Sequence, residues 1–320
     1  MQGLLLFYKP VDWRNKDILK FFQKTFGRDI KIGHSGTLDP FARGLMVMGL
    51  GRKFTRQLHD LLLHSQKEYI SKIEFGKISS TLDVEGDIKE IESKTKPSLA
   101  DIKNIIEYDF LGEKAQIPPI FSAKKHKGKR LRDIADNADI EEIARSKTKN
   151  VTLYGFEILS YQYPYLEIKL LVSSGYYIRS FGNDLGKKLG VGAYTKELKR
   201  TKLGEFSVDN AILPTDIERS CHPELAEGSP FIELWGEIFG NVQGVGLRYF
   251  SGRLAEKFNI SGYIKNTGNN SVEFCAQGDL NSIINFQTEI LQVPAPITIS
   301  DYKFIIQKPK KLYKNFEITL

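Results

Sequence analysis

Residues 33–44 bring together the residue types that chemistry on a ligand requires. This stretch contains three glycines together with the imidazole of His34, the carboxylate of Asp39 and the guanidinium of Arg43. Glycines allow a loop to approach a ligand closely. Pro40 restrains Asp39 to an extended backbone, which fixes the direction of its carboxylate. A surface turn capped by Asp39 is the alternative that composition alone favours.

The order of these residues, G-H-S-G-T-L-D-P-x-A-x-G-L, closely resembles the catalytic motif of the TruB family. Members of this family are tRNA pseudouridine synthases that act on uridine 55 of the T-loop. The resemblance runs in order from residue 3 to about residue 217, roughly two thirds of the chain. It implies that Asp39 is the catalytic aspartate and that His34 fills the space left by the flipped nucleotide. For His34 alone, a passive hydrogen-bonding role is the alternative.

A partner for Asp39 comes from the segment G-Y-Y-I-R, residues 175–179, which matches the family motif G-x-Y-I-R. A guanidinium beside a carboxylate lowers the pKa of that carboxylate and stabilises its charged form. We therefore expect Arg179 to pair with Asp39, and the resemblance places Tyr177 against the substrate. An ordinary surface ion pair is the alternative for Arg179.

Two further residues follow from the same resemblance. Tyr69 aligns with the active-site tyrosine that stacks on the target base and takes part in proton transfer, and Leu198 aligns with the apolar residue beneath that base. Taken alone, Tyr69 is more typical of a core aromatic in a strand. Pseudouridine formation breaks a C–N glycosidic bond, turns the base and joins C5 to C1′. It requires no cofactor or metal, and the sequence contains no zinc spacing, P-loop or dinucleotide fingerprint. Whether Asp39 attacks as a nucleophile or starts glycal formation stays open.

The charge of the chain predicts an anionic partner. The net charge is +7 and the pI is about 9.1, which favours nucleic acid among the possible partners. The densest basic segment contains Lys124, Lys125, Lys127, Lys129, Arg130 and Arg132. A solvated charge run is one interpretation. The other is an insertion that contacts RNA phosphates, and the family resemblance favours it because a mobile loop at this place grips the T-arm of tRNA.

Composition excludes several classes of protein. No apolar run is long enough to span a bilayer, and the first residues lack the features of a signal peptide. Two cysteines, Cys221 and Cys275, are too few for a disulfide framework. We expect a cytoplasmic monomer.

The last ninety or so residues predict a second domain. Residues 218–231 are polar and contain proline and glycine, as a linker does. Beyond them the order of elements is β-α-β-β-α-β, a ferredoxin-like layout. Glycine-rich turns that lead into a helix suit anions, and Gly244 and Gly246 stand in such a turn, directly before Arg248.

This region is similar to the acylphosphatase family through V-Q-G-V-G-x-R-Y-F and G-Y-I-K-N-T. The resemblance implies that Arg248 binds phosphate and that Asn266 orients the attacking water, while Leu247 replaces a more common phenylalanine. TruB proteins usually carry a C-terminal PUA domain that binds RNA, and no such segment is found here. A domain that binds RNA phosphate in its place is the alternative to acyl phosphate hydrolysis.

The predicted fold is α+β, with a mixed, largely antiparallel sheet flanked by helices and a C-terminal ferredoxin-like domain. We expect strands at 4–8, 45–50, 67–75, 151–160, 166–172 and 206–208, and helices at 16–26, 54–63, 99–110 and 182–189. The predicted domains are residues 1–217, the linker 218–231 and residues 232–320. The predicted function is isomerisation of uridine 55 in tRNA, with hydrolysis of acyl phosphates as a second activity. A non-catalytic protein that binds or folds tRNA, or acylphosphatase as the main activity, are the alternatives.

Overall fold

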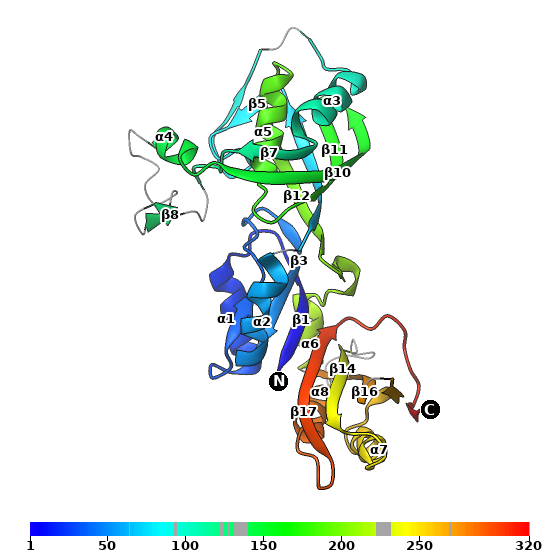
Figure 1. Ribbon diagram of the computed structural model, residues 1–320. Helices are drawn as coiled ribbons and strands as arrows, with labels where there is room; N and C mark the ends of the chain where they lie inside the picture. Colours follow the sequence, from blue (N-terminus) through cyan, green and yellow to red (C-terminus); the bar gives the residue numbers. More distant parts are fainter. Residues whose placement is uncertain are drawn as a thin grey trace. The chain divides into compact units, whose positions relative to one another are not determined.

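The computed structural model describes residues 1–63, 65–92, 95–121, 125–126, 129–130, 140–221, 232–268 and 270–319 (Figure 1). The chain forms two compact units, each built from segments that are separated in sequence. Unit 1 consists of Met1–Thr37, Gly44–Leu62 and Phe206–Leu320, and unit 2 consists of Leu38–Arg43 and Leu63–Glu205. Among the described helices, none combines the length and the apolar character that a membrane span requires.

Unit 2 is built on an antiparallel sheet. Its strands, in spatial order, are β12 (Ala193–Leu203), β4 (Lys67–Phe75), β11 (Tyr165–Val172), β10 (Lys149–Gln162) and β7 (Gly112–Gln116). Every second residue of β11, from Leu166 to Val172, is fully buried. This alternation is the pattern of a sheet with one covered face.

Helix α5 (Ile178–Lys188) covers that sheet and carries the end of the G-x-Y-I-R motif. It lies close to β12, because a Cβ atom on Gly186 would stand 2.3 Å from the backbone nitrogen of Ala193. Helix α3 (Leu99–Ile105) continues directly into a π-helical turn at Ile106–Phe110, whereas the sequence predicts one α-helix over 99–110. The remaining elements of unit 2 are β5 (Lys77–Ser79), β6 (Ile88–Glu90), β8 (Lys125–His126), β9 (Lys129–Arg130) and α4 (Ile140–Arg145).

Unit 1 joins the N-terminal strands to the C-terminal region in one sheet. Its strands, in spatial order, are β18 (Phe316–Ile318), β15 (Ser261–Thr267), β16 (Ser271–Gly278), β14 (Ile232–Asn241), β17 (Thr298–Gln307), β1 (Gly3–Lys9) and β3 (Arg43–Leu50), with β2 (Ile32–His34) also on β3. Strand β1 pairs with β3 in antiparallel fashion and with β17 in parallel, where Leu4 lies opposite Ile305. Gly3 permits this close approach, since a Cβ there would stand 3.1 Å from the Phe304 carbonyl oxygen.

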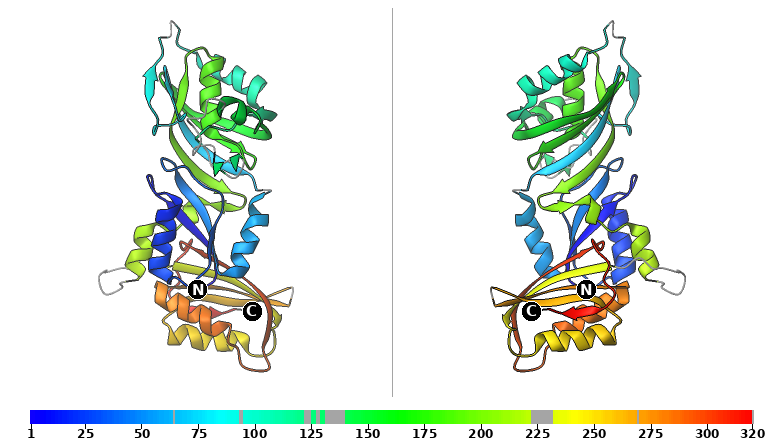
Figure 2. Two further views of the ribbon diagram at one scale, coloured as in Figure 1. Left: turned by 90° about the vertical axis from the view of Figure 1, so that its left-hand side faces the viewer. Right: turned by 90° about the vertical axis from the view of Figure 1, so that its right-hand side faces the viewer.

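The helices of unit 1 pack on this sheet. Figure 2 shows α1 (Asn15–Phe26) and α2 (Arg52–Leu63) on opposite sides of β1 and β3, and α7 (Leu247–Lys257) and α8 (Leu280–Ile290) together on one face of the C-terminal strands. Phe22 of α1 meets Phe7 of β1 edge to face, with ring centroids 4.9 Å apart. The order β14-α7-β15-β16-α8-β17 confirms the ferredoxin-like layout. Three short elements precede it: β13 (Phe206–Ser207), a 3₁₀ turn at Val208–Asn210 and α6 (Pro214–Ser220).

Candidate active site

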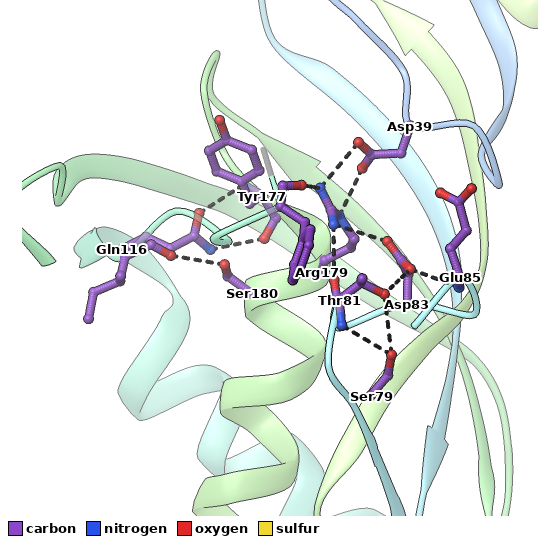
Figure 3. Close-up of polar contacts among 11 residues, drawn as sticks. Asp39, Ser79, Thr81, Asp83, Glu85, Gln116, Tyr177, Arg179 and Ser180 are labelled. Carbon is purple, nitrogen blue, oxygen red and sulfur yellow. Dashed lines mark hydrogen bonds and ion pairs between the residues drawn. The ribbon is translucent and has the colours of Figure 1, made fainter. Parts of the chain in front are cut away.

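Arg179 stands at the centre of a cluster of polar side chains in unit 2 (Figure 3). It is the second residue of α5, and its side chain is only 4% exposed. Its Nε lies 2.9 Å from Oδ2 of Asp39, and its Nη2 donates to Oδ1 of the same carboxylate at 3.2 Å. The Nη2 contact is a charge-assisted hydrogen bond, whereas the Nε contact is an ion pair without hydrogen-bond geometry, so the guanidinium holds the carboxylate at two points by charge.

A second carboxylate, that of Asp83, holds the other edge of the guanidinium. Nη1 of Arg179 donates to Oδ2 of Asp83 at 3.0 Å, and the Asp83 side chain is 2% exposed. The carbonyl oxygens of Thr81 and Phe121 accept further hydrogen bonds from Arg179, each at 3.0 Å. The buried guanidinium of Arg179 is therefore fixed between the carboxylates of Asp39 and Asp83. Of these two carboxylates, the sequence predicts only Asp39 as a site residue.

Asp83 is itself held by its own loop, between β5 and β6. Its Oδ1 accepts from Thr81 Oγ1 at 2.5 Å and from the backbone nitrogen of Glu85 at 3.0 Å. The sequence predicts no role for Asp83. The local signal for one is weak: Leu82 has a positive φ of 65°, a strained conformation that appears only once the fold is known.

Asp39 is presented by a tight turn. The backbone nitrogen of Ala42 donates to the Asp39 carbonyl oxygen at 3.1 Å, and Pro40 occupies the second position of this turn, where proline is favoured. The Asp39 side chain is 33% exposed, in contrast to the 2% of Asp83. Of the two carboxylates on Arg179, Asp39 is therefore the one that a ligand can reach.

Tyr69 and Leu198 lie on neighbouring strands of the same sheet. In the register of β4 with β12, Tyr69 is opposite Arg200 and Ser71 is opposite Leu198, so both predicted residues belong to one face. Tyr69 and Leu198 are almost fully buried, and the Ser71 hydroxyl has no partner among the described residues.

A basic group adjoins this face. Arg200 is buried, and Lys67, two residues before Tyr69, donates to the Ser174 hydroxyl at 3.1 Å. Burial, and secondly the charge of Arg200, lower the pKa of Lys67 to about 8.

Tyr177 precedes α5, and its backbone is held from both sides by one side chain. Gln116 Oε1 accepts from the Tyr177 nitrogen at 2.8 Å, while Gln116 Nε2 donates to the Tyr177 carbonyl oxygen at 3.0 Å. Sequence reasoning missed Gln116. His34 is the exposed last residue of β2 and lies in unit 1, where it is opposite Met48. Lys124 and Lys127 lie outside the described residues, and the backbone of Lys125 belongs to β8.

The predicted anion loop of the C-terminal region is present in unit 1. Gly244 and Gly246 have positive φ angles of 73° and 93°, and Gly246 directly precedes α7. Nη1 of Arg248 donates to the Thr319 carbonyl oxygen at 2.9 Å. Asn266, in β15, has a buried Oδ1 without a partner among the described residues. No group of three or more His, Cys, Asp or Glu side chains in the described part of the chain could hold a metal ion.

Comparison with known proteins finds one family in each of two parts of the chain. The TruB family pseudouridylate synthase (N terminal domain) model matches residues 23–178. The tRNA pseudouridine synthase B of Protochlamydia amoebophila is 41% identical over 217 residues, which cover 68% of this chain and 80% of that protein. The enzyme of Clostridium tetani is 39% identical over 217 residues, or 68% and 73% of the two chains. The chain belongs to the TruB family of pseudouridine synthases.

The fold agrees with this membership. A chain in the crystal structure of a Cbf5-Nop10-Gar1 complex matches with a TM-score of 0.53 and 25% identity, over 71% of this TruB-family chain and 57% of that one. The Acylphosphatase family model matches residues 235–318, so an acylphosphatase domain follows the synthase region. The predicted fold class and both resemblances are confirmed. The roles of individual site residues stay predictions.

Proposed function

We propose that this TruB-family protein converts uridine 55 in the T-loop of tRNA to pseudouridine, with Asp39 as the catalytic aspartate. The observation that carries the proposal is the reachable Asp39 carboxylate, held by two contacts to the buried Arg179. A carboxylate fixed in this way is prepared to act at C1′ of the ribose without first having to be oriented.

The remaining residues would serve the detached base. Cleavage of the C1′–N1 bond leaves the bonding electrons on N1 and frees the uracil, which turns so that C5 bonds to C1′. The C5 proton then leaves to an acceptor, and N1 takes up a proton to give the neutral product. Tyr69 would stack on the ring and take part in that proton transfer, with Leu198 beneath the base. His34 would occupy the space of the flipped nucleotide, and Tyr177 would contact the substrate. Lys124, Lys125 and Lys127 would contact the RNA backbone.

The test is pseudouridine mapping of a T-arm RNA after incubation with the wild-type protein, Asp39→Asn and the control Asp87→Asn. Asp87 is an exposed aspartate in the loop that follows β5. We expect modification at the T-loop uridine with the wild type and the control, and none with Asp39→Asn, which should still bind the RNA. A wild-type protein that binds without modifying would favour the non-catalytic RNA-binding alternative. An Asp39→Asn protein that also loses most binding would make Asp39 a structural turn residue.

A second activity, hydrolysis of acyl phosphates, is favoured by the unpartnered Asn266 oxygen. A buried acceptor without a donor is costly to maintain, and a water molecule bound for attack on phosphorus would supply the donor. Arg248 would bind the phosphate, together with the backbone of the Gly244–Gly246 turn. We keep residues 1–217, 218–231 and 232–320 as the proposed division between the synthase, the linker and this domain.

This second activity is tested on the full chain. Release of phosphate from an acyl phosphate should fall by about 100-fold in Arg248→Ala. It should be unchanged in Arg253→Ala, which removes an exposed arginine from the same helix. Equal rates in the two variants would exclude Arg248 from catalysis and would favour a domain that only binds anions.

A further inference from the structure

A cavity of about 280 Å³ opens in unit 2 beside the G-x-Y-I-R segment. Its walls come from the π-helical turn, β7, β10, α5 and the loop before α5, and they include Phe110, Lys114, Gln116, Tyr176, Asp184 and Lys187. Its volume is near the lower end of the range of roughly 300–1,000 Å³ that is typical of small-ligand sites. A π-helical turn in a cavity wall is itself a frequent mark of a functional site. We call this the Tyr176 cavity.

The acceptor of the Tyr176 cavity is Asp184. Its carboxylate accepts one hydrogen bond, from Asn183 Nδ2 at 3.0 Å, and no other described residue donates to it. Burial raises the pKa of Asp184, and it raises the pKa of the Tyr176 hydroxyl too, with the charge of Asp184 as the second cause. A desolvated carboxylate with spare acceptor sites is stabilised by a ligand that brings N–H donors.

The cations of the Tyr176 cavity leave positive charge available. Lys188 is paired with Asp109 at 3.0 Å. The charge of Lys187 acts on Asp184, partly offsetting the effect of burial on the pKa of that carboxyl, but Lys187 forms no ion pair with any described residue. Lys114 has only a long 3.5 Å contact with the Tyr108 carbonyl oxygen. Lys187 and Lys114 can therefore neutralise an incoming anion.

This arrangement restricts the ligand. The lysines would repel a simple cation, and the Asp184 carboxylate would repel a free phosphate, so neither ligand fits all of the charges in the wall. A flat ring that directs N–H donors at Asp184, lies against Tyr176 and carries a negative group toward Lys187 satisfies every part of it. A nucleotide has this chemistry. We propose that the Tyr176 cavity binds a nucleotide of the RNA substrate other than the uridine that is isomerised.

The position of the cavity explains why such binding would matter. Gln116, in its wall, makes the two hydrogen bonds that hold the backbone of Tyr177, and Arg179 follows two residues later (Figure 3). On the same side, the Ser180 hydroxyl donates to the Ile117 carbonyl oxygen at 2.9 Å. A base seated beside Gln116 would thus stabilise the segment that positions Arg179 on Asp39. The inference rests on the proposed action on RNA.

The experiment measures binding of T-arm RNAs that carry a single abasic site at each loop position except the target. The proteins are the wild type, Asp184→Asn, Lys187→Ala and the control Asp87→Asn. At one position, loss of the base should weaken wild-type and control binding by about tenfold. The same abasic site should weaken RNA binding by Asp184→Asn only slightly, because the interaction between that base and the Asp184 carboxylate is already lost in this variant. Lys187 is exposed, so Lys187→Ala serves as the second variant if Asp184→Asn fails to fold.

If the effect of removing a base and the effect of Asp184→Asn on binding are additive at every loop position, the inference is overturned. Titration with the four nucleoside monophosphates distinguishes a nucleotide of the RNA from a free nucleotide as the ligand. If nucleotide binding depends on Asp184 but the abasic effects are additive, the cavity is a site for free nucleotides, and the inference is also overturned. Wild-type modification of the intact RNA is measured in parallel. If the wild-type protein does not modify the intact RNA, only the T-arm assignment is refuted. The mononucleotide titration then tests the Tyr176 cavity, and the absence of nucleotide binding that depends on Asp184 would refute the proposal.

Discussion

Asp83→Asn is the most informative substitution for the site, because it changes one charge without changing the shape of the side chain. The carboxylate of Asp83 accepts from Thr81 and from the Glu85 backbone with one oxygen, and from Arg179 with the other. An asparagine can supply only one acceptor oxygen. If that oxygen stays on Thr81 and Glu85, its NH₂ group faces Nη1 of Arg179, donor against donor.

The expected magnitude follows from this geometry. A hydrogen bond to a charged group contributes about 1.5–3 kcal/mol, and the Coulomb energy of two unit charges about 4 Å apart, near 4 kcal/mol at an effective dielectric constant of 20, is the upper limit. We expect a loss of about 3 kcal/mol in the free energy of unfolding. At 2–4 °C for each kcal/mol, the Tm falls by about 6–12 °C. A guanidinium released on one edge shifts the Asp39 carboxylate, and a displacement of about 1 Å lowers the rate by about 100-fold.

The assay is single-turnover formation of pseudouridine with saturating enzyme, together with thermal unfolding and the Kd for T-arm RNA. Asp87→Asn is the matched control, since it makes the same change in the same loop on an exposed residue. The rate and the Tm should fall in Asp83→Asn alone, with the Kd changed by less than about threefold. A single-turnover rate within twofold of the wild type, in a protein whose Tm has dropped, would refute the idea that Asp83 positions Arg179 for catalysis.

Two further predictions concern lysines. Replacing Lys124, Lys125 and Lys127 by glutamine should weaken RNA binding and flatten the dependence of log K on log salt concentration, and an unchanged slope would separate this segment from the RNA backbone. Lys67 has a folded pKa of about 8, below the value near 10.4 of an unfolded lysine. The unfolded state therefore binds more protons between these values, and Lys67 contributes stability that rises with pH. In urea unfolding at pH 7 to 10, wild-type stability should rise relative to Lys67→Met, and a constant difference would contradict the assigned burial.

The sequence predicts those site residues that lie within short, contiguous motifs. The turn at Asp39 and the pairing of Asp39 with Arg179 follow from residue types within two local segments. Asp83 and Gln116 lie far from both segments, at 96 residues and 61 residues from their partners Arg179 and Tyr177. Their roles arise from hydrogen bonds that exist only after the sheet and α5 have assembled. No local pattern distinguishes a buried Asp83 from the exposed Asp87 of the same loop.

The same limit applies to two elements of the fold. The sequence predicts no strand at residues 193–203, because charged residues interrupt the apolar alternation there. Strand β12 nonetheless forms, and Arg200 is buried within it. The residues of the π-helical turn at 106–110 have ordinary helical composition, so composition does not distinguish this turn from an α-helix. The turn packs against α5 through Phe110 and Phe181, whose ring centroids lie 5.0 Å apart, and such a contact exists only in the folded chain.

The parallel pairing of β1 with β17 bears on the order in which the molecule is made. Strand β1 leaves the ribosome before β3 and β17, and it can pair with β3 soon after β3 is made. Its other edge is completed later, by Ile212 opposite Phe7 and by β17, which ends at Gln307, opposite Leu4 and Leu5. At about 5–20 residues per second, this delay lasts about 15–60 s, during which an apolar strand edge stays open to other nascent chains. The acylphosphatase domain therefore closes the part of the β1 edge at Leu4 and Leu5, and we expect a chain that stops before β17 to be held by chaperones rather than released.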